Sequence, residues 1–547
     1  MSQHLFSPAG RQAALERMAR EQFDLLIIGG GITGSTLARD AALRGLRVAL
    51  VEKEDFGYGT SSRSSKLIHG GIRYLAQGDV RVTRESAVER KVLRRIAPHL
   101  VHPLPFVFPL FQRDNTLIYR AGFRLFDWMA GSTEAERHRL LTAREVLAVA
   151  PLLGGPVVGG VIYGEYITDD ARFTMENALS AAIHGAAVAN HLRMAGFIWE
   201  GGRVVGARVE DTLTGESFPV SAKVVVNATG PWAEQTLAEA NLRAPKHLLI
   251  SKGIHLLFPA RRLPLEGAVA LRSPSGKEGF AIPRWDYVYV GTTDVPHDGP
   301  IDRPTTDRAA LEHVLSMAQE CFPAAKLTEA DILGTWAGVR PLIAEGKSAR
   351  ETSRRDEIWK IADGLLTTAG GKLTTARPMA NRVMEHVARE LGRDLGDNRR
   401  TAEDLLPNAQ LDGQAFEHFQ EEMAETLRRR GVAPEAAKRI TWMYGASVKE
   451  LLRYGDEDPA WLTPLGPNVP AVRGEVRLAV EHEMALTLED FMDRRAALLI
   501  FSPGHGLAVA EGAARIMGDL LGWDEAVRNR QVEAYRAQVR RHDIAGI

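Results

Sequence analysis

The sequence has one cysteine, almost no net charge and no long apolar run. Cys321 is the only cysteine among 547 residues, so no internal disulfide can form and a reducing compartment is the easier interpretation. Lys and Arg number 68 and Asp and Glu 69, a formal net charge of −1, so no overall field attracts nucleic acid. No uncharged apolar run approaches the ~20 residues needed to span a bilayer. These absences leave a soluble protein or one that lies on a membrane surface, with no nucleic-acid partner.

Metal-ligand spacings and a signal peptide are also missing. No CxxC or HExxH pattern occurs and the 16 histidines are scattered, so we expect no metal site. Residues 1–22 are polar and have no apolar core, so we interpret them as an N-terminal extension and not as a signal peptide. The length of 547 residues is enough for two or three domains.

Residues 23–53 have the pattern of a dinucleotide-binding βαβ unit. Asp24–Ile28 is a short apolar run typical of a strand buried on both faces. Three glycines then form G-x-G-x-x-G, at Gly29, Gly31 and Gly34. The first permits a tight turn, the second lets a pyrophosphate approach the backbone, and the third lets helix and strand pack closely. Residues 33–44 continue as a helix whose N-terminal N–H groups suit a diphosphate.

Glu52 ends the next predicted strand, about 20 residues after the last glycine, where an acid that binds a ribose hydroxyl is expected. A carboxylate here argues against a 2′-phosphate, which would favour an arginine. Glycine-rich turns also arise for backbone reasons alone. Here strand, turn, helix, strand and acid all occur in order, so we predict a dinucleotide site.

The segment 57–75, GYGTSSRSSKLIHGGIRYL, is dense in Gly and Ser and ends in basic and aromatic residues. Such a composition is typical of a flexible surface loop. However, His69, Arg73 and Tyr74 around two glycines are unusual in a linker. We favour a functional loop whose donors bind the far end of the dinucleotide, with Arg73 facing a substrate anion.

The middle of the chain reads as a large β-sheet domain interleaved with the nucleotide-binding one. Residues 202–209 and 217–226 predict a hairpin. Residues 223–232, KVVVNATGPW, predict a buried strand that opens onto a glycine near the cofactor. Prolines break up residues 98–109, so we expect an irregular or edge segment there. Residues 365–378 predict a strand, a glycine turn and a helix start, which is either an ordinary βα turn or a site that stabilises negative charge on a cofactor ring.

Residues 116–129, TLIYRAGFRLFDWM, combine aromatic and aliphatic bulk with two arginines. This composition suits a helix that lies in a membrane interface. An ordinary buried helix between domains is the other interpretation. Beyond about residue 399 the pattern changes to amphipathic helices, which marks a helical C-terminal domain.

The motifs together resemble one known family. The glycine turn with Glu52 is followed by TSSRSSKLIHGGIRYL, NATGPW, GTTD, AGVRPL and GGKLTTAR. In this order and spacing, over roughly residues 20–380, they resemble the FAD-dependent glycerol-3-phosphate dehydrogenases, and the helical tail is similar to that family's as well.

The resemblance implies an α/β fold with a Rossmann-type FAD-binding domain, an interleaved β-rich substrate-capping domain and an all-helical C-terminal domain. The FAD-dependent oxidoreductase region would span residues 23–398 and the helical domain residues 399–547. Within the first region, the resemblance implies cofactor segments at roughly 23–95, 170–235 and 335–398, and capping segments at roughly 96–169 and 236–334.

Site residues carry over one at a time from the resemblance. Those matching cofactor contacts for FAD are Gly29, Gly31, Gly34, Glu52, Thr60, Ser61, Ser62, Thr229, Gly230, Gly371, Lys372, Leu373 and Thr374. Those matching the substrate pocket are Arg73, Tyr74, His255, Arg340 and Lys372.

The residue types agree with oxidation of a secondary alcohol, in which a hydride moves to the flavin while a base takes the hydroxyl proton. Arg73 and Arg340 suit a dianionic phosphate. Among the residues expected to be catalytic, Lys372 would polarise the developing oxygen and Arg340 would hold the substrate. His255 is the candidate base because its ordinary pKa lies near working pH, although a lone histidine on an apolar strand is more often structural.

The resemblance implies oxidation of sn-glycerol 3-phosphate to dihydroxyacetone phosphate, with electrons passed to membrane quinone. The alternative is an oxidase of the same fold that returns electrons to oxygen; the absence of a long polar insertion between residues 270 and 340 favours the dehydrogenase. A flavin-binding regulatory protein would not need the basic pocket, and a relative acting on amino acids would need fewer phosphate-matching cations. We expect a cytoplasmic protein, peripheral on the inner face of the cell membrane, and leave a homodimer open.

Overall fold

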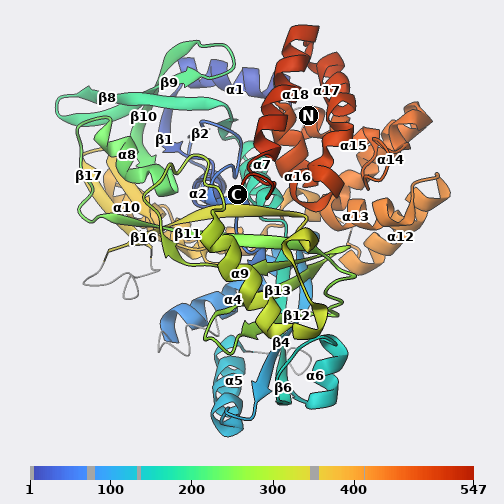
Figure 1. Ribbon diagram of the computed structural model, residues 1–547. Helices are drawn as coiled ribbons and strands as arrows, with labels where there is room; N and C mark the ends of the chain where they lie inside the picture. Colours follow the sequence, from blue (N-terminus) through green and yellow to red (C-terminus); the bar gives the residue numbers. More distant parts are fainter. Residues whose placement is uncertain (1–4, 71–79, 132–136, 345–355, 412) are drawn as a thin grey trace.

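The computed structural model describes residues 5–70, 80–131, 137–344, 356–411 and 413–547. In the view of Figure 1, one β-sheet lies at the upper left and a second lies below it, while helices from the last part of the chain pack along the right side. The α/β fold class with a helical C-terminal region is confirmed.

The first sheet has a parallel core. Its strands are β1 Gln22–Ile28, β2 Val48–Val51, β7 Ala187–Ala189, β8 Leu192–Glu200, β9 Arg203–Asp211, β10 Ser217–Asn227, β17 Glu357–Ala362 and β18 Leu365–Ala369. They follow the order β17-β18-β10-β1-β2-β7, with β8 and β9 extending the sheet beside β10. β10, the predicted late strand, runs parallel to both β1 and β18 and antiparallel to β9. The hairpin and the buried strand predicted in this region are therefore confirmed.

Helices cover both faces of this sheet. They are α1 Pro8–Arg20, α2 Ile32–Leu43, α7 Asp170–Ile183 and α10 Ala376–Leu391. Leu25 and Ile27 of β1 pack in one cluster with α2, α7 and α10, whereas Leu26 and Ile28 pack in another with α1. Successive side chains of a strand point to opposite faces. A strand covered on both faces is therefore apolar throughout, which explains the short apolar run at the start of the nucleotide-binding unit.

The second sheet is mixed and larger. Its strands are β3 Leu67–Ile68, β4 Val101–Phe111, β5 Arg139–Thr142, β6 Val157–Thr168, β11 Leu248–Pro259, β12 Ala268–Arg272, β13 Glu278–Arg284, β14 Tyr287–Gly291, β15 Val295–Pro296 and β16 Gly334–Ile343. They follow the order β15-β11-β14-β13-β12-β4-β6-β3, with β16 beside β11 and β5 beside β6. β3 and β16 thus both belong to the second sheet, although the sequence analysis placed their residues in cofactor segments.

The remaining helices include those that cover the second sheet and those that form the C-terminal region. They are α4 Val80–Ile96, α5 Thr116–Ala130, α6 Ala143–Val149, α8 Ala233–Ala238, α9 Arg308–Cys321, α11 Arg399–Glu403, α12 Phe416–Arg429, α13 Pro434–Tyr444, α14 Val448–Glu457, α15 Arg473–His482, α16 Leu498–Phe501, α17 Leu507–Leu521 and α18 Glu525–Val539, with a π-helical turn at Asp490–Arg495. α6 and α9 pack on one face of the sheet. Residues of α12, α13 and α16 join Phe106, Tyr289 and Trp336 in the cluster on the other face.

The expectation of an irregular or edge segment at residues 98–109 is wrong. β4 occupies most of this segment and pairs with β6 along its whole length, while β12 pairs with it on the other side at Phe106 and Val107. Pro103, Pro105 and Pro109 stand at odd-numbered positions, so their missing N–H groups fall along one edge of the strand. The ladder on the opposite edge is unaffected, which is how an interior strand tolerates three prolines.

The N-terminal extension is folded onto the first sheet. Arg11 of α1 donates to Asp211 (2.9 Å) and to the carbonyl oxygen of Asn190 (3.0 Å). Phe6 stacks on Phe56, with ring centroids 5.3 Å apart. The extension therefore contacts the loop that follows β2.

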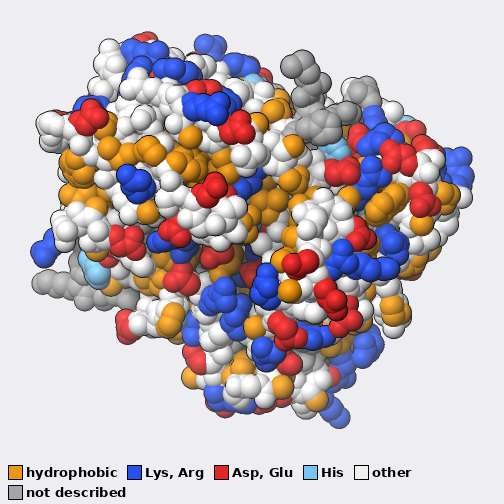
Figure 2. All heavy atoms as spheres, turned by 90° about the horizontal axis from the view of Figure 1, so that it is seen from above, with side chains coloured by type: hydrophobic (Ala, Val, Ile, Leu, Met, Phe, Trp, Pro, Cys, Tyr) orange, Lys and Arg blue, Asp and Glu red, His pale blue; other side chains and the backbone are white. Residues whose placement is uncertain are grey.

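Acidic and basic side chains are interspersed on the face shown in Figure 2, with hydrophobic patches between them. Among the residues described, no helix is both long and apolar enough to cross a membrane.

Candidate active site

The turn after β1 leaves no room for side chains at two glycines. A Cβ atom on Gly34 would lie 1.8 Å from the carbonyl oxygen of Gly29, and one on Gly29 would lie 2.7 Å from the oxygen of Ala228. Gly29 also has a φ of +107°, which L side chains rarely adopt. Strand, turn and helix therefore meet so closely that only glycine fits.

The N-terminus of α2 meets the loop at residues 60–66. Its N-cap, Gly31, has no side chain to cap the helix, and the N–H of Ile32 donates instead to Ser61 Oγ at 2.9 Å. Free N–H groups and the dipole at a helix N-terminus favour an anion. The Ser61 hydroxyl thus lies at the N-terminus of α2, where a phosphate group would be expected to bind.

Glu52 lies at the end of β2 and faces the same turn. Its carboxylate accepts from the N–H groups of Gly30 (2.6 Å) and Glu54 (2.9 Å). Burial raises the pKa of Glu52, while these two N–H groups act in the opposite direction. The carboxylate is held rigidly over the end of β1, where a ribose hydroxyl would meet it.

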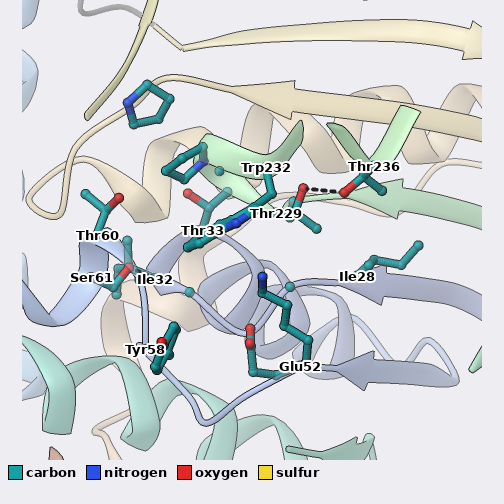
Figure 3. Close-up of a pocket in the computed structure, with 18 of the residues that line it drawn as sticks. Ile28, Ile32, Thr33, Glu52, Tyr58, Thr60, Ser61, Thr229, Trp232 and Thr236 are labelled. Atoms are coloured by element: carbon teal, nitrogen blue, oxygen red, sulfur yellow. Dashed lines mark hydrogen bonds between the residues drawn. The ribbon is translucent and has the colours of Figure 1, made fainter. Parts of the chain in front are cut away.

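A cavity of about 350 Å³ joins these features. Figure 3 shows Glu52 on one side of the end of β1, Thr229 and Trp232 on the other, and Thr60 and Ser61 beside the start of α2. The predicted cofactor residues on its wall are Gly29, Gly31, Glu52, Thr60, Ser61, Thr229, Gly230, Gly371, Lys372 and Leu373. Gly34, Ser62 and Thr374 do not line it: Gly34 lies under the turn, and Ser62 and Thr374 are buried.

Among the wall residues that the sequence did not predict as cofactor contacts are Lys53, Tyr58 and Trp232. The Lys53 Nζ atom lies 4.3 Å from the centroid of the Trp232 ring. Asp302 accepts from both Lys53 Nζ (2.6 Å) and Trp232 Nε1 (2.9 Å), and its backbone oxygen accepts from the Tyr58 hydroxyl (3.2 Å). Trp232 ends the NATGPW motif, but nothing in the sequence pairs it with Lys53 or Asp302.

His255 lies behind the loop, not on the cavity wall. It is 2% exposed, its Nε2 is 2.9 Å from Ser65 Oγ, and its ring stacks on Trp336 with centroids 4.6 Å apart. Burial, with the positive charges of Arg340 and Lys66, holds the pKa of His255 well below its usual value. The imidazole is therefore neutral at neutral pH, the form that accepts a proton.

Arg340 lies on β16 beside β11, the strand that carries His255. Its guanidinium donates to Thr292 Oγ1 (3.0 Å) and to the Thr293 carbonyl oxygen (3.1 Å). A Cβ atom on Gly253 would lie 2.3 Å from its Nη2, so glycine makes room for this arginine. Lys372 lines the cavity, whereas Arg73 and Tyr74 lie outside the described residues.

Two family models match the chain. One, described as FAD dependent oxidoreductase, matches residues 24–377, and another, described as C-terminal domain of alpha-glycerophosphate oxidase, matches residues 407–528. The aerobic glycerol-3-phosphate dehydrogenase of Bacillus subtilis (strain 168) is 36% identical over 545 residues, which is 97% of each chain.

Solved structures are similar as well. The X-ray structure of the glycerol-3-phosphate dehydrogenase from Bacillus halodurans complexed with FAD matches with a TM-score of 0.82 and 33% identity over 98% of each chain. The L-alpha-glycerophosphate oxidase from Mycoplasma pneumoniae with FAD bound matches with a TM-score of 0.53 and 18% identity, covering 69% of this chain and 96% of that one. The second likeness shows a shared fold alone.

The Gly34→Ala protein should lose its dinucleotide. The added methyl group would lie 1.8 Å from the Gly29 oxygen, so the turn has to open and the phosphate position is lost. We expect less than a tenth of the flavin absorbance per chain after purification. Gly122→Ala is the control, because a Cβ atom there meets nothing within 4 Å. Full flavin content in the Gly34 variant would show that the dinucleotide binds elsewhere.

Proposed function

The chain belongs to the FAD-dependent oxidoreductase family and, within it, to the glycerol-3-phosphate dehydrogenases, and on this premise we propose that it oxidises sn-glycerol 3-phosphate to dihydroxyacetone phosphate. The observation that carries the proposal is one cavity in which the glycine turn, Glu52 and Lys372 meet. His255 and Arg340, on neighbouring strands, supply a neutral imidazole and a cation beside it.

The residues of the cavity fit FAD. The turn has no space for side chains at Gly29 and Gly34, the N-terminus of α2 suits a pyrophosphate, and Glu52 suits a ribose hydroxyl. These residues would hold the adenosine diphosphate half, and Thr60 and Ser61, with the segment 371–373, would hold the remainder. When bound, FAD supplies the acceptor for a hydride.

The cations would hold the phosphate of the substrate. A guanidinium stays charged and matches a phosphate with two parallel hydrogen bonds, so we assign this role to Arg340 and to Arg73, and we keep Tyr74 as a proposed substrate contact. Lys372, on the cavity wall, would stabilise negative charge on the substrate oxygen as its proton leaves.

We assign to His255 the role of the base that accepts the proton of the substrate hydroxyl. The described residues offer its Nε2 one hydrogen-bond partner, the Ser65 hydroxyl, and Ser65 is only half-buried. The substrate hydroxyl would therefore pass its proton to Ser65 Oγ as Ser65 passes its own to His255 Nε2. This relay explains how a histidine that is almost fully buried can serve as a base.

The first test is anaerobic mixing of the purified yellow protein with sn-glycerol 3-phosphate. Flavin absorbance should bleach fully, because the substrate is the only hydride donor present. Glycerol without phosphate is the matched control and should leave the absorbance unchanged. A flavin that stays oxidised with sn-glycerol 3-phosphate would contradict the proposed substrate.

His255→Ala should slow this bleaching at saturating substrate at least a hundredfold, since a positioned base contributes about 10²–10⁴ in rate. The substrate concentration at half-maximal rate should change less than threefold. In the wild-type protein, the lowered pKa of His255 predicts a rate that stays flat from about pH 8 down to about pH 6. Stopped-flow absorbance measures both, and an unchanged limiting rate in the variant would remove His255 from the reaction.

For the electron acceptor we propose membrane quinone, with oxygen as the alternative. The sequence argument is the missing insertion between residues 270 and 340. Re-oxidation of the bleached protein by a water-soluble quinone, without peroxide in air, would favour the dehydrogenase.

Contact with a membrane surface is supported by α5. Leu117, Ile118 and Trp128 are 71%, 67% and 79% exposed, and Leu125 is 44% exposed on the same helix. Phe123, in contrast, is 3% exposed and packs in the hydrophobic cluster of the second sheet that contains Phe106. The helix is therefore buried along one side and apolar on the exposed side as well. With Arg120 and Arg124 beside this stripe, the helix suits an anionic bilayer surface, and we propose peripheral attachment to the inner face of the cell membrane.

Flotation with anionic liposomes tests this attachment. Replacing Leu117, Ile118 and Trp128 together by Ser removes side chains worth about 1.5–3 kcal/mol each on burial, so the floating fraction should fall at least fivefold. The control replaces Trp199, Leu213 and Ile183 by Ser, three residues of the same types that are 41–45% exposed elsewhere. Equal flotation of both triple variants would exclude α5 as the contact.

A further inference from the structure

The π-helical turn Asp490–Arg495 lies between the C-terminal helices and the loops of the cofactor cavity. Its Arg494 Nε lies 2.7 Å from Asp55 Oδ2, and its Arg495 donates to both Asp55 oxygens at 2.7 and 2.8 Å. Its Asp493 accepts both arms of the Arg63 guanidinium, at 3.1 and 2.5 Å. Asp55 and Arg63, on two loops of the N-terminal region, thus both form ion pairs with one turn near the other end of the chain.

These ion pairs are buried. The side chains of Asp55, Arg494, Arg495 and Asp493 are at most 2% exposed, and that of Arg63 is 12% exposed. Burial alone would raise the pKa of Asp493, but the charges of Arg63 and Arg494 hold it below its usual range. Single turns of π-helix are rare and frequent at functional sites.

The loop side chains that make the ion pairs lie close in sequence to side chains of the cavity. Asp55 follows Glu52 by three positions, and Arg63 follows Thr60, Ser61 and Ser62 directly. Arg63 Nη1, which bonds Asp493, also lies 3.1 Å from Ser62 Oγ. Ser62 is bonded through the backbone to Ser61, whose side chain accepts from the first N–H of α2. An unbroken series of contacts therefore runs from Asp493 to the phosphate position.

The shared fold does not need the whole of this chain. The more distant structure of the same fold, which binds FAD, matches only 69% of this chain while 96% of its own length is covered. Buried charge pairs are also poor contributors to stability compared with apolar residues of similar volume. A role in positioning explains both observations.

We propose that Arg63 and Asp493 are positioning residues of the cofactor site, through which the C-terminal helical region holds Ser61 and Ser62 against the N-terminus of α2. The inference rests on the proposed binding of FAD in this cavity. It gives the C-terminal region a function in cofactor retention, in addition to covering the second sheet.

The test compares FAD release from full-length holoproteins, followed as a rise in flavin fluorescence after dilution. Removing Asp493 alone would leave Arg63 buried without its partner, which destabilises a protein strongly. The informative variant is therefore the double replacement Arg63→Met with Asp493→Leu, which removes both charges. It should release FAD at least tenfold faster than the wild type, with a thermal unfolding midpoint within a few degrees at saturating FAD.

The matched control is Arg430→Met with Asp456→Leu, an ion pair of 2.6 Å in the same C-terminal region with side chains 36% and 64% exposed. It should release FAD at the wild-type rate. Release at the wild-type rate from the Arg63/Asp493 variant would overturn the inference.

If the double replacement lowers the unfolding midpoint, a second variant separates cofactor release from loss of stability. Arg63→Lys keeps the charge opposite Asp493 but lacks the fork that reaches Asp493 and Ser62 together. It should release FAD at least threefold faster with an unchanged midpoint, and wild-type release would contradict the proposal. A wild-type chain that holds no FAD would instead contradict the proposed function.

Discussion

The contact between the loop 60–66 and strand β16 is the constraint on which the two sheets depend. Thr60 Oγ1 donates to the Val339 carbonyl oxygen at 2.7 Å, and Trp336 Nε1 lies 3.4 Å from the Ser64 oxygen. Gly338 lies between them, where a Cβ atom would be 2.7 Å from the Arg63 oxygen. The same loop reaches α2 through Ser61. A shift of either sheet would therefore move the residues at the dinucleotide turn and those around His255 together.

Charged side chains fill the space between these loops and the C-terminal helices. Arg172 is fully buried, bonds both oxygens of Glu483 and donates to two backbone carbonyls. Lys66 pairs with Asp170 at 2.6 Å, and Asp170 also accepts from Ser64. Such groups are tolerated in an interior only when each is paired. They give this interface a fixed geometry that apolar packing alone would not define.

The sequence was informative wherever a structure depends on neighbouring residues. The glycine turn, Glu52, the late parallel strand and the amphipathic C-terminal helices all follow from local spacing. β4 was misjudged because the effect of a proline depends on which edge of the strand has a neighbour. The links from Lys53 and Trp232 to Asp302, and from Asp55 to Arg495, join residues so far apart that no local pattern indicates them.

The ion pair between Asp55 and Arg495 joins residues separated by 440 positions. β1, at the start of the chain, likewise pairs with β10, which in turn pairs with β18. During synthesis, which adds about 5–20 residues per second, the cofactor loops therefore remain without their buried partners until nearly the whole chain has been made. Until then the charged side chains of these loops stay in water, although every strand of the first sheet has been made once β18 ends at Ala369. The cofactor loops therefore reach their final arrangement only late, when residues near the two ends of the polypeptide have met.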